Sequence, residues 1–164
     1  MSATPYTFDS LEAFVDRALP ATGWLPIEQD RIDAFAGCTD DRQWIHLDRE
    51  RARAESAQGT TIAHGLLVLG LLPRFSYEAG LLPAGASHAL NYGFDKVRFL
   101  SPVPSGARVR DTITVVSVQR KSPTQALVGF RHRVDIEGGD KPALIAEALN
   151  LFVAAPASAA GGGL

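Results

Sequence analysis

An acid and an imidazole lie five residues apart in the run Asp41-Arg-Gln-Trp-Ile-His46. A carboxylate beside a histidine can hold one water molecule and move protons to and from it. On a helix this spacing separates the two side chains by about 140°, and on a strand they point to opposite faces. We therefore expect the chain to turn between them if they share a site. In the alternative interpretation, Asp40 or Asp41 only caps a turn and His46 is a half-exposed surface residue.

A second feature with chemical potential is the run Thr61-Ile-Ala-His-Gly65, where an apolar helix is predicted to begin. Backbone N–H groups at a helix start have no intrahelical partner, and the helix dipole favours negative charge there. Because Gly65 has no side chain, a carbonyl oxygen can approach its N–H closely, as in an oxyanion hole. The alternative is a glycine required only for tight packing of the helix against a sheet.

The remaining reactive side chains give weaker signals. His132 lies on the apolar face of its predicted strand and is expected to be a hydrogen-bonded core histidine, whereas His88 precedes a strand and is expected to be exposed. Cys38 is the only cysteine, so it has no partner for an internal disulfide, and no zinc-ligand spacing occurs, which fits a reducing compartment. Four arginines on predicted strands could bind phosphates, although strand arginines are usually solvated. They are Arg98, Arg108, Arg110 and Arg131.

Length and composition narrow the class of protein. The chain has 164 residues, 46% of them hydrophobic, and a net charge of -2, so a sizeable core is possible and nothing favours a nucleic acid or an anionic membrane as partner. The longest apolar run, 66–73, is far shorter than the ~20 residues of a membrane helix. We also expect no signal peptide, and hence a cytoplasmic location. We predict one domain over 1–155 and a disordered, Ala- and Gly-rich tail over 156–164.

Hydrophobic spacing predicts the elements that must position these residues. Short helices are expected over 11–19, 29–36 and 49–56, with Gly37 ending the second and Asp48 capping the third. The helix that begins near Ala63 is apolar on all sides, so we expect it to be buried all round and to kink or end at Pro73. Hairpin-linked strands follow over 89–100, 108–119, 127–137 and 144–153.

The last of these segments is apolar on both faces, and its place after three strands favours a central strand over a helix. Helices followed by an antiparallel meander indicate the α+β class. A sheet wrapped around the apolar helix would explain why that helix has no polar side.

Two motifs together resemble the MaoC-like dehydratases, also called (R)-specific enoyl-CoA hydratases: the segment 35–48 and the segment 59–65. Gln43-Trp-Ile-His46, and Asn91-Tyr-Gly93 followed by Val97-Arg-Phe99, look closest to the branch that includes nodulation protein N. The resemblance covers roughly residues 24–153. It implies a hot-dog fold, in which a curved antiparallel sheet surrounds a central helix, and, for a chain with one such unit, a homodimer.

The resemblance also implies roles for individual residues. Asp41, rather than Asp40, matches the acid of the family because the family places it five residues before the histidine, which His46 matches. The N–H of Gly65 matches the group that holds the thioester oxygen, with Ala63 and His64 beside it in the substrate-binding segment. No metal or cofactor is implied, since coenzyme A is part of the substrate. Some members carry a serine late in the central helix, but 69–73 contains no hydroxyl group here.

The implied reaction is the reversible hydration of a trans-2-enoyl-CoA to a (3R)-3-hydroxyacyl-CoA, a step of fatty acid metabolism. One rival is a hot-dog thioesterase, many of which carry a carboxylate on the central helix; no Asp or Glu occurs from Ser56 to Tyr77. The other rival is a non-catalytic acyl-CoA-binding protein. It would be stabilised by acyl-CoA without turning it over.

Overall fold

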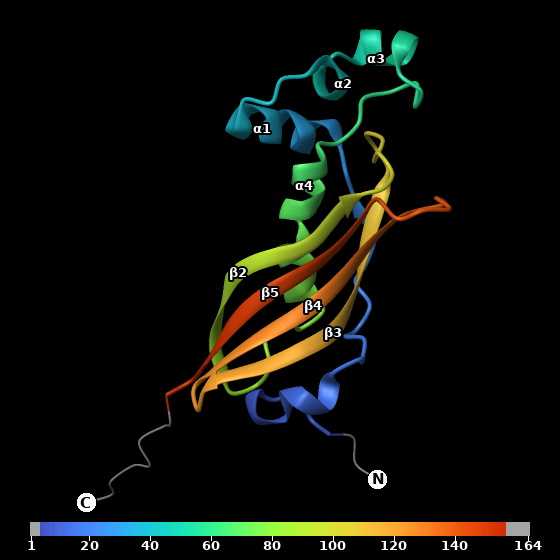
Figure 1. Cartoon of the computed structure of the whole chain (residues 1–164). Coiled ribbons are helices and arrows are strands. Elements are labelled where there is room, and N and C mark those ends of the chain that lie inside the picture. The colour runs from blue at the N-terminus through green and yellow to red at the C-terminus, as the bar shows by residue number, and fades with distance from the viewer. Residues whose placement is uncertain (1–3, 157–164) are drawn as a thin grey trace, which may run out of the picture.

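The computed structural model describes residues 4–156, so the predicted tail lies, apart from Pro156, outside the described residues. Five antiparallel strands form one sheet in the order β1-β3-β4-β5-β2. Their bounds are β1 Leu25–Pro26, β2 Ala86–Phe99, β3 Arg108–Ser122, β4 Gln125–Ile136 and β5 Leu144–Ala154. Figure 1 shows this curved sheet on one side of α4 and a cap of small helices beyond one end. The predicted α+β architecture is confirmed.

The strand order differs from the predicted meander in one respect. β5 is a central strand as predicted, but its second neighbour is β2, which therefore does not pair with β3. The connection between β2 and β3 instead crosses the start of the central helix. There the Ala63 N–H donates to Val103 O at 2.8 Å, and the Ser105 N–H donates to Thr61 O at 2.8 Å. These bonds pair backbone groups of the connection with the segment before α4, so the connection does not form a hairpin.

The first predicted helix is wrong in position and type. The chain forms a 3₁₀ helix, η1, over Phe8–Phe14, which begins at a capping box formed by Thr7 and Ser10. The helix ends at Phe14 because the backbone that follows it pairs with β3. The Asp16 N–H donates to Val115 O at 2.8 Å, and the Leu19 N–H donates to Ile113 O at 2.9 Å. Pairing with a distant strand thus overrides the local helical spacing.

Three helices make up the cap. α1 spans Gln29–Thr39, so Gly37 does not end it; Asp40 does, in a left-handed conformation with φ 59°. α2 is a single turn over Trp44–Leu47. α3 spans Arg49–Glu55, and the Asp48 side chain caps it by accepting from the Arg51 N–H, as predicted.

The central helix is split into α4, Gly65–Gly70, and α5, Leu72–Glu78. Pro73 lies in the first turn of α5, where its missing N–H removes no helical hydrogen bond, so the predicted kink is confirmed. The expectation of burial on all sides is wrong for a single chain: Leu66 is 61% exposed and Tyr77 is 83% exposed. The sheet covers only one side of the helix.

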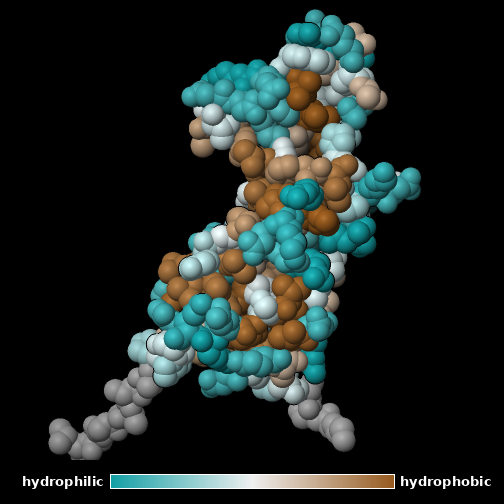
Figure 2. All heavy atoms as spheres, in the orientation of Figure 1, coloured by the Kyte–Doolittle hydropathy of each residue, from teal (hydrophilic) through white to brown (hydrophobic). Residues whose placement is uncertain are grey.

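Apolar surface continues on the edge strand β2 and just beyond it. The exposed large hydrophobic side chains there are Leu90, Tyr92, Phe94, Phe99 and Leu100. Figure 2 shows brown patches on this side of the sheet and at the waist between the sheet and the helical cap. Within residues 4–156, no helix combines the length and the apolar character needed to cross a membrane.

Candidate active site

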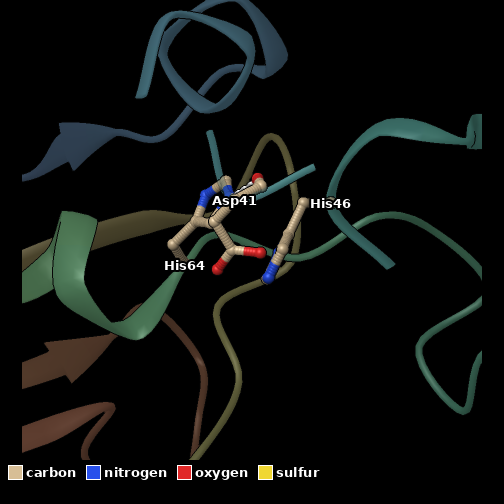
Figure 3. A group of neighbouring side chains, drawn as sticks. All are labelled: Asp41, His46 and His64. Carbon is tan, nitrogen blue, oxygen red and sulfur yellow. Dashed lines mark hydrogen bonds between the residues drawn. The ribbon is translucent and has the colours of Figure 1, made fainter. Parts of the chain in front are cut away.

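Asp41, His46 and His64 meet where the helical cap joins the central helix. Asp41 lies in the coil after α1, His46 lies in the one-turn helix α2, and His64 is the N-cap residue of α4. One side-chain ligand atom from each lies within 4.8 Å of those of the other two. Figure 3 shows the three side chains gathered beside the start of α4. The chain therefore turns between Asp41 and His46 and brings the acid and the imidazole to one place.

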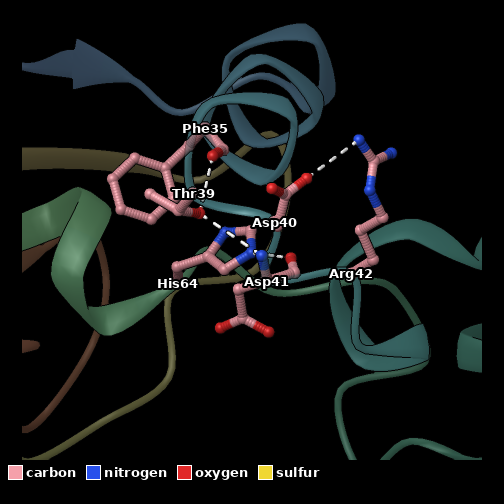
Figure 4. A network of polar contacts seen from close by, with 6 residues as sticks. All are labelled: Phe35, Thr39, Asp40, Asp41, Arg42 and His64. Atoms are coloured by element: carbon pink, nitrogen blue, oxygen red, sulfur yellow. Dashed lines mark hydrogen bonds and ion pairs between the residues drawn. The ribbon is translucent and has the colours of Figure 1, made fainter.

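The two neighbouring aspartates have different environments. Asp40 ends α1, and its side chain is exposed and forms an ion pair with Arg42 at 3.5 Å. The Thr39 hydroxyl donates to Phe35 O at 2.8 Å and lies 3.5 Å from the Asp41 N–H, which fixes the turn (Figure 4). Asp40 therefore supplies the helix end and Asp41 points toward the histidines, which separates the roles that the sequence left open.

The His46 ring is held so that its Nε2 atom can accept a hydrogen bond. Its side chain is buried, with 6% exposed, which rules out the half-exposed surface histidine. Nδ1 lies 2.7 Å from Ile62 O, and because a carbonyl can only accept, Nδ1 carries the hydrogen. Burial is the main cause that lowers the pKa of His46, so the neutral ring is favoured at pH 7. Its Nε2 then carries a free lone pair.

Asp41 is held in the ionised form. The side-chain amide of Gln43 donates to Asp41 Oδ1 at 3.1 Å, and this bond is the main cause that lowers the pKa of Asp41. Among residues 4–156 the Asp41 carboxylate and the His46 ring form no direct hydrogen bond. Two acceptors that share one water at normal hydrogen-bond lengths are about 4.6 Å apart. An Asp41 carboxylate oxygen and a ring nitrogen of His46 lie within 4.8 Å of each other, a limit that includes this separation.

His64 supports both partners from behind. The Nε2–H donates to the backbone O of Asp41 at 2.9 Å, and the ring stacks on His46 with centroids 3.7 Å apart. Phe35 packs against the same ring at 4.9 Å. In the sequence His64 appeared only as part of a substrate-binding segment. Its contact with the Asp41 carbonyl joins residues 23 apart, and no local pattern signals such a bond.

The ring geometry argues against a metal ion bound by all three residues. Carboxylate and imidazole groups are common metal ligands. However, a ring nitrogen binds a metal within its own ring plane at about 2.0 to 2.1 Å. The planes of His46 and His64 are only 25° apart at a centroid separation of 3.7 Å, so they do not meet at such a distance.

Gly65 opens α4 beside a cavity of about 270 Å³ whose lining includes His46, Ala63, Gly65 and Val68. Its N–H has no acceptor among residues 4–156, whereas the Ala63 N–H is bonded to Val103 O. A Cβ atom at Gly65 would lie 2.9 Å from Cδ1 of Phe99, which is too close. The glycine thus permits both tight packing and access to a free N–H, and the two interpretations are compatible.

Comparisons with known proteins identify the family to which the chain is similar. A family model described as "MaoC like domain" matches residues 11–134. The chain is 41% identical over 151 residues to 3-hydroxyacyl-thioester dehydratase Z of Mycobacterium tuberculosis, covering 90% of this chain and 99% of the relative. It is 36% identical over 138 residues to nodulation protein N of Rhizobium leguminosarum bv. viciae, covering 84% and 86%.

Solved structures show the same fold. A monoamine oxidase regulatory protein from Archaeoglobus has 25% identity and a TM-score of 0.77, covering 95% of this chain and 99% of that one. An unliganded (R)-hydratase from Pseudomonas aeruginosa has 24% identity and a TM-score of 0.69, covering 85% and 83%. The curved sheet with its central helix is the hot-dog fold of these hydratases, as predicted.

Proposed function

The chain belongs to the MaoC-like dehydratase family, and on that premise we propose that it interconverts 2-enoyl and 3-hydroxyacyl thioesters by adding or removing water. The observation that carries the proposal is the placement of two acceptors. An Asp41 carboxylate oxygen and a ring nitrogen of His46 lie within 4.8 Å of each other, and His46 and Gly65 line the same cavity. This arrangement supports a water site and a thioester-oxygen site side by side.

In the hydration direction, the water donates one hydrogen to Asp41 and the other to Nε2 of His46. Its oxygen attacks the β-carbon, its proton passes to Nε2, and the electrons of the double bond move onto the thioester oxygen, which accepts from the Gly65 N–H. The imidazolium then returns the proton to the α-carbon. His46 is the stronger base of the two. The lowered pKa of Asp41 keeps its carboxylate ionised, and this negative charge stabilises the imidazolium that forms beside it.

The finer assignments extend the proposal. The substrate is an acyl-CoA, the product is the (3R)-3-hydroxyacyl-CoA, and the chain's own residues carry the reaction without a metal or redox cofactor. A dehydratase of 3-hydroxyacyl thioesters that is 41% identical over nearly its whole length supports the thioester substrate. The central helix, α4 with α5, has no Asp or Glu before Glu78, which disfavours thioesterases that place a carboxylate on this helix.

We also propose a homodimer. The apolar side of the central helix at Leu66 and Tyr77 is uncovered, and the edge strand β2 carries a row of exposed hydrophobic side chains. A second copy would cover both surfaces and satisfy the open edge of β2. Sedimentation equilibrium at micromolar protein would give twice the chain mass; a monomer mass throughout would contradict the dimer.

The function is tested with crotonyl-CoA by following the loss of the conjugated double bond. We expect wild-type turnover, and a loss of at least ~100-fold in Asp41→Ala and in His46→Ala, the usual scale for a positioned acid–base group. Asp40→Asn is the matched control and should keep the wild-type rate, because its side chain is exposed and Asn tolerates the left-handed backbone at this position. Wild-type rates in both variants would reject the assignment.

Two other outcomes would indicate a different function. Release of free CoA would indicate a thioesterase, and thermal stabilisation by acyl-CoA without turnover would indicate a binding protein.

A further inference from the structure

A second Asp–His pair lies in the sheet, outside the active site described above. Asp111 on β3 and His132 on β4 are each 1% exposed, and they are diagonal neighbours across the strand pair. His132 Nδ1 lies 2.6 Å from Asp111 Oδ2, and the Arg133 N–H donates to Oδ1 at 3.2 Å. The predicted core histidine is confirmed. Because Nδ1 is occupied, Nε2 is the polar atom that His132 retains for another partner.

His132 also lines a cavity of about 290 Å³ between α5 and the sheet. Asn150 on β5, only 7% exposed, lines it as well, beside apolar Leu72 and Ala148. Among residues 4–156, neither the Asn150 amide nor His132 Nε2 has a hydrogen-bond partner, and both groups are open to the cavity. A ligand that covered such a polar group without pairing it would lose about 1–3 kcal/mol. The cavity wall therefore presents two polar groups that favour a polar ligand atom.

The two cavities are lined by successive turns of the central helix, although they have no lining residue in common. Val68 lines the active-site cavity and Leu72 lines this one, and residues four apart lie on the same helix face. From Gly65 to the cavity residues Leu72 and Ser76 the helix rises about 10 to 16 Å. An extended chain of roughly eight to twelve carbons spans that distance. A thioester bound at Gly65 would place its distal carbons beside His132 and Asn150.

We propose that this cavity selects acyl thioesters that carry a hydroxyl group on the distal part of the chain; this rests on the function proposed above. A hydroxyl both donates and accepts, so it can pair with His132 Nε2 and with the Asn150 amide together. A methyl end would leave both groups unpaired. A carboxylate would bring negative charge toward the buried Asp111 carboxylate, so the neutral oxygen group fits best.

The test compares two substrates of equal length, trans-2-decenoyl-CoA and its 10-hydroxy analogue, with eight- and twelve-carbon pairs to cover the span. We expect kcat/KM to favour the hydroxylated member of at least one pair about tenfold or more, the scale of one unpaired buried group. Asn150→Leu should remove that preference. Leu149→Ala is the matched control on the opposite face of β5 and should keep it.

Equal or lower kcat/KM for every hydroxylated substrate would overturn the inference, as would a preference that survives Asn150→Leu. Wild-type turnover of crotonyl-CoA, which is too short to reach the cavity, tests the proposed function separately. If Asn150→Leu does not fold, Ser76→Leu fills the same cavity from the helix side. It should lower kcat/KM for the ten-carbon pair at least severalfold relative to crotonyl-CoA, and an unchanged ratio would reject the cavity as the binding site.

Discussion

The molecule contains two Asp–His pairs built to opposite designs. Asp41 and His46 come from one short segment, do not touch, and leave space for a water between a half-exposed carboxylate and a ring with a free lone pair. Asp111 and His132 come from two strands, bond directly at 2.6 Å, and are almost completely buried. The same two residue types thus form the proposed proton-handling pair in one place and a directly bonded pair within the sheet in the other.

The largest expected effect is the loss of stability on removing the bond between Asp111 and His132. Asp111→Ala should lower the free energy of unfolding by about 3–5 kcal/mol, because it leaves His132 and the Arg133 N–H without their buried acceptor. Urea unfolding followed by circular dichroism measures this change. Asp135→Ala, which removes a more exposed ion pair with Arg133 from the same strand, is the control and should change stability by less than about 1 kcal/mol. Equal urea midpoints for the two variants would contradict the contrast between the pairs.

A smaller effect tests how the separated pair is held apart. His64→Leu removes the bond to the Asp41 carbonyl and the stacking on His46, so we expect kcat to fall about tenfold with a smaller change in KM, because misplaced catalytic groups slow turnover. The Gln amide can still donate to that carbonyl, so His64→Gln should recover much of kcat. Thermal unfolding of both variants controls for stability. If both lose kcat equally, His64 does not act through Asp41.

The smallest effect concerns pH. Burial lowers the pKa of His46 below its ordinary value of 6.5, so the unfolded chain binds the proton more readily than the folded one. His46 therefore contributes its full stability above pH 6.5, and this contribution is lost as the pH falls below that value. For the same reason the acidic fall in kcat/KM should lie below pH 6.5. A rate profile from about pH 5 to 8 checks this, and a midpoint above 6.5 would contradict it.

Features that depend only on neighbouring residues could be predicted from the sequence. Strand alternation identified β4 and the face on which His132 lies, and the Asp48 cap placed α3. Spacing alone indicated that Asp41 and His46 can share a site only if the chain turns between them. The motif resemblance, rather than spacing, selected Asp41 over Asp40, and the left-handed Asp40 now supplies the physical reason.

Features that depend on distant pairing could not be predicted this way. β2 is exposed along most of its length, and nothing in its sequence indicates that β5 is its neighbour. The contact between Asp111 and His132 depends on the register of β3 and β4, and the 3₁₀ helix η1 ends because Asp16 bonds to β3. The expected burial of the whole central helix is wrong at Leu66 because the sheet covers only one side of the helix.

The backbone bonds around Thr61 and Ala63 have a consequence for engineering. They fasten the end of the site segment to the strand connection, and the Ile62 N–H donates to Ile45 O at 3.0 Å beside His46. The chain between these fixed points, from α3 to the exposed tip at 57–59, carries none of the reactive groups. That tip is therefore the place to insert a tag or a partner domain while leaving the geometry of the candidate site unchanged.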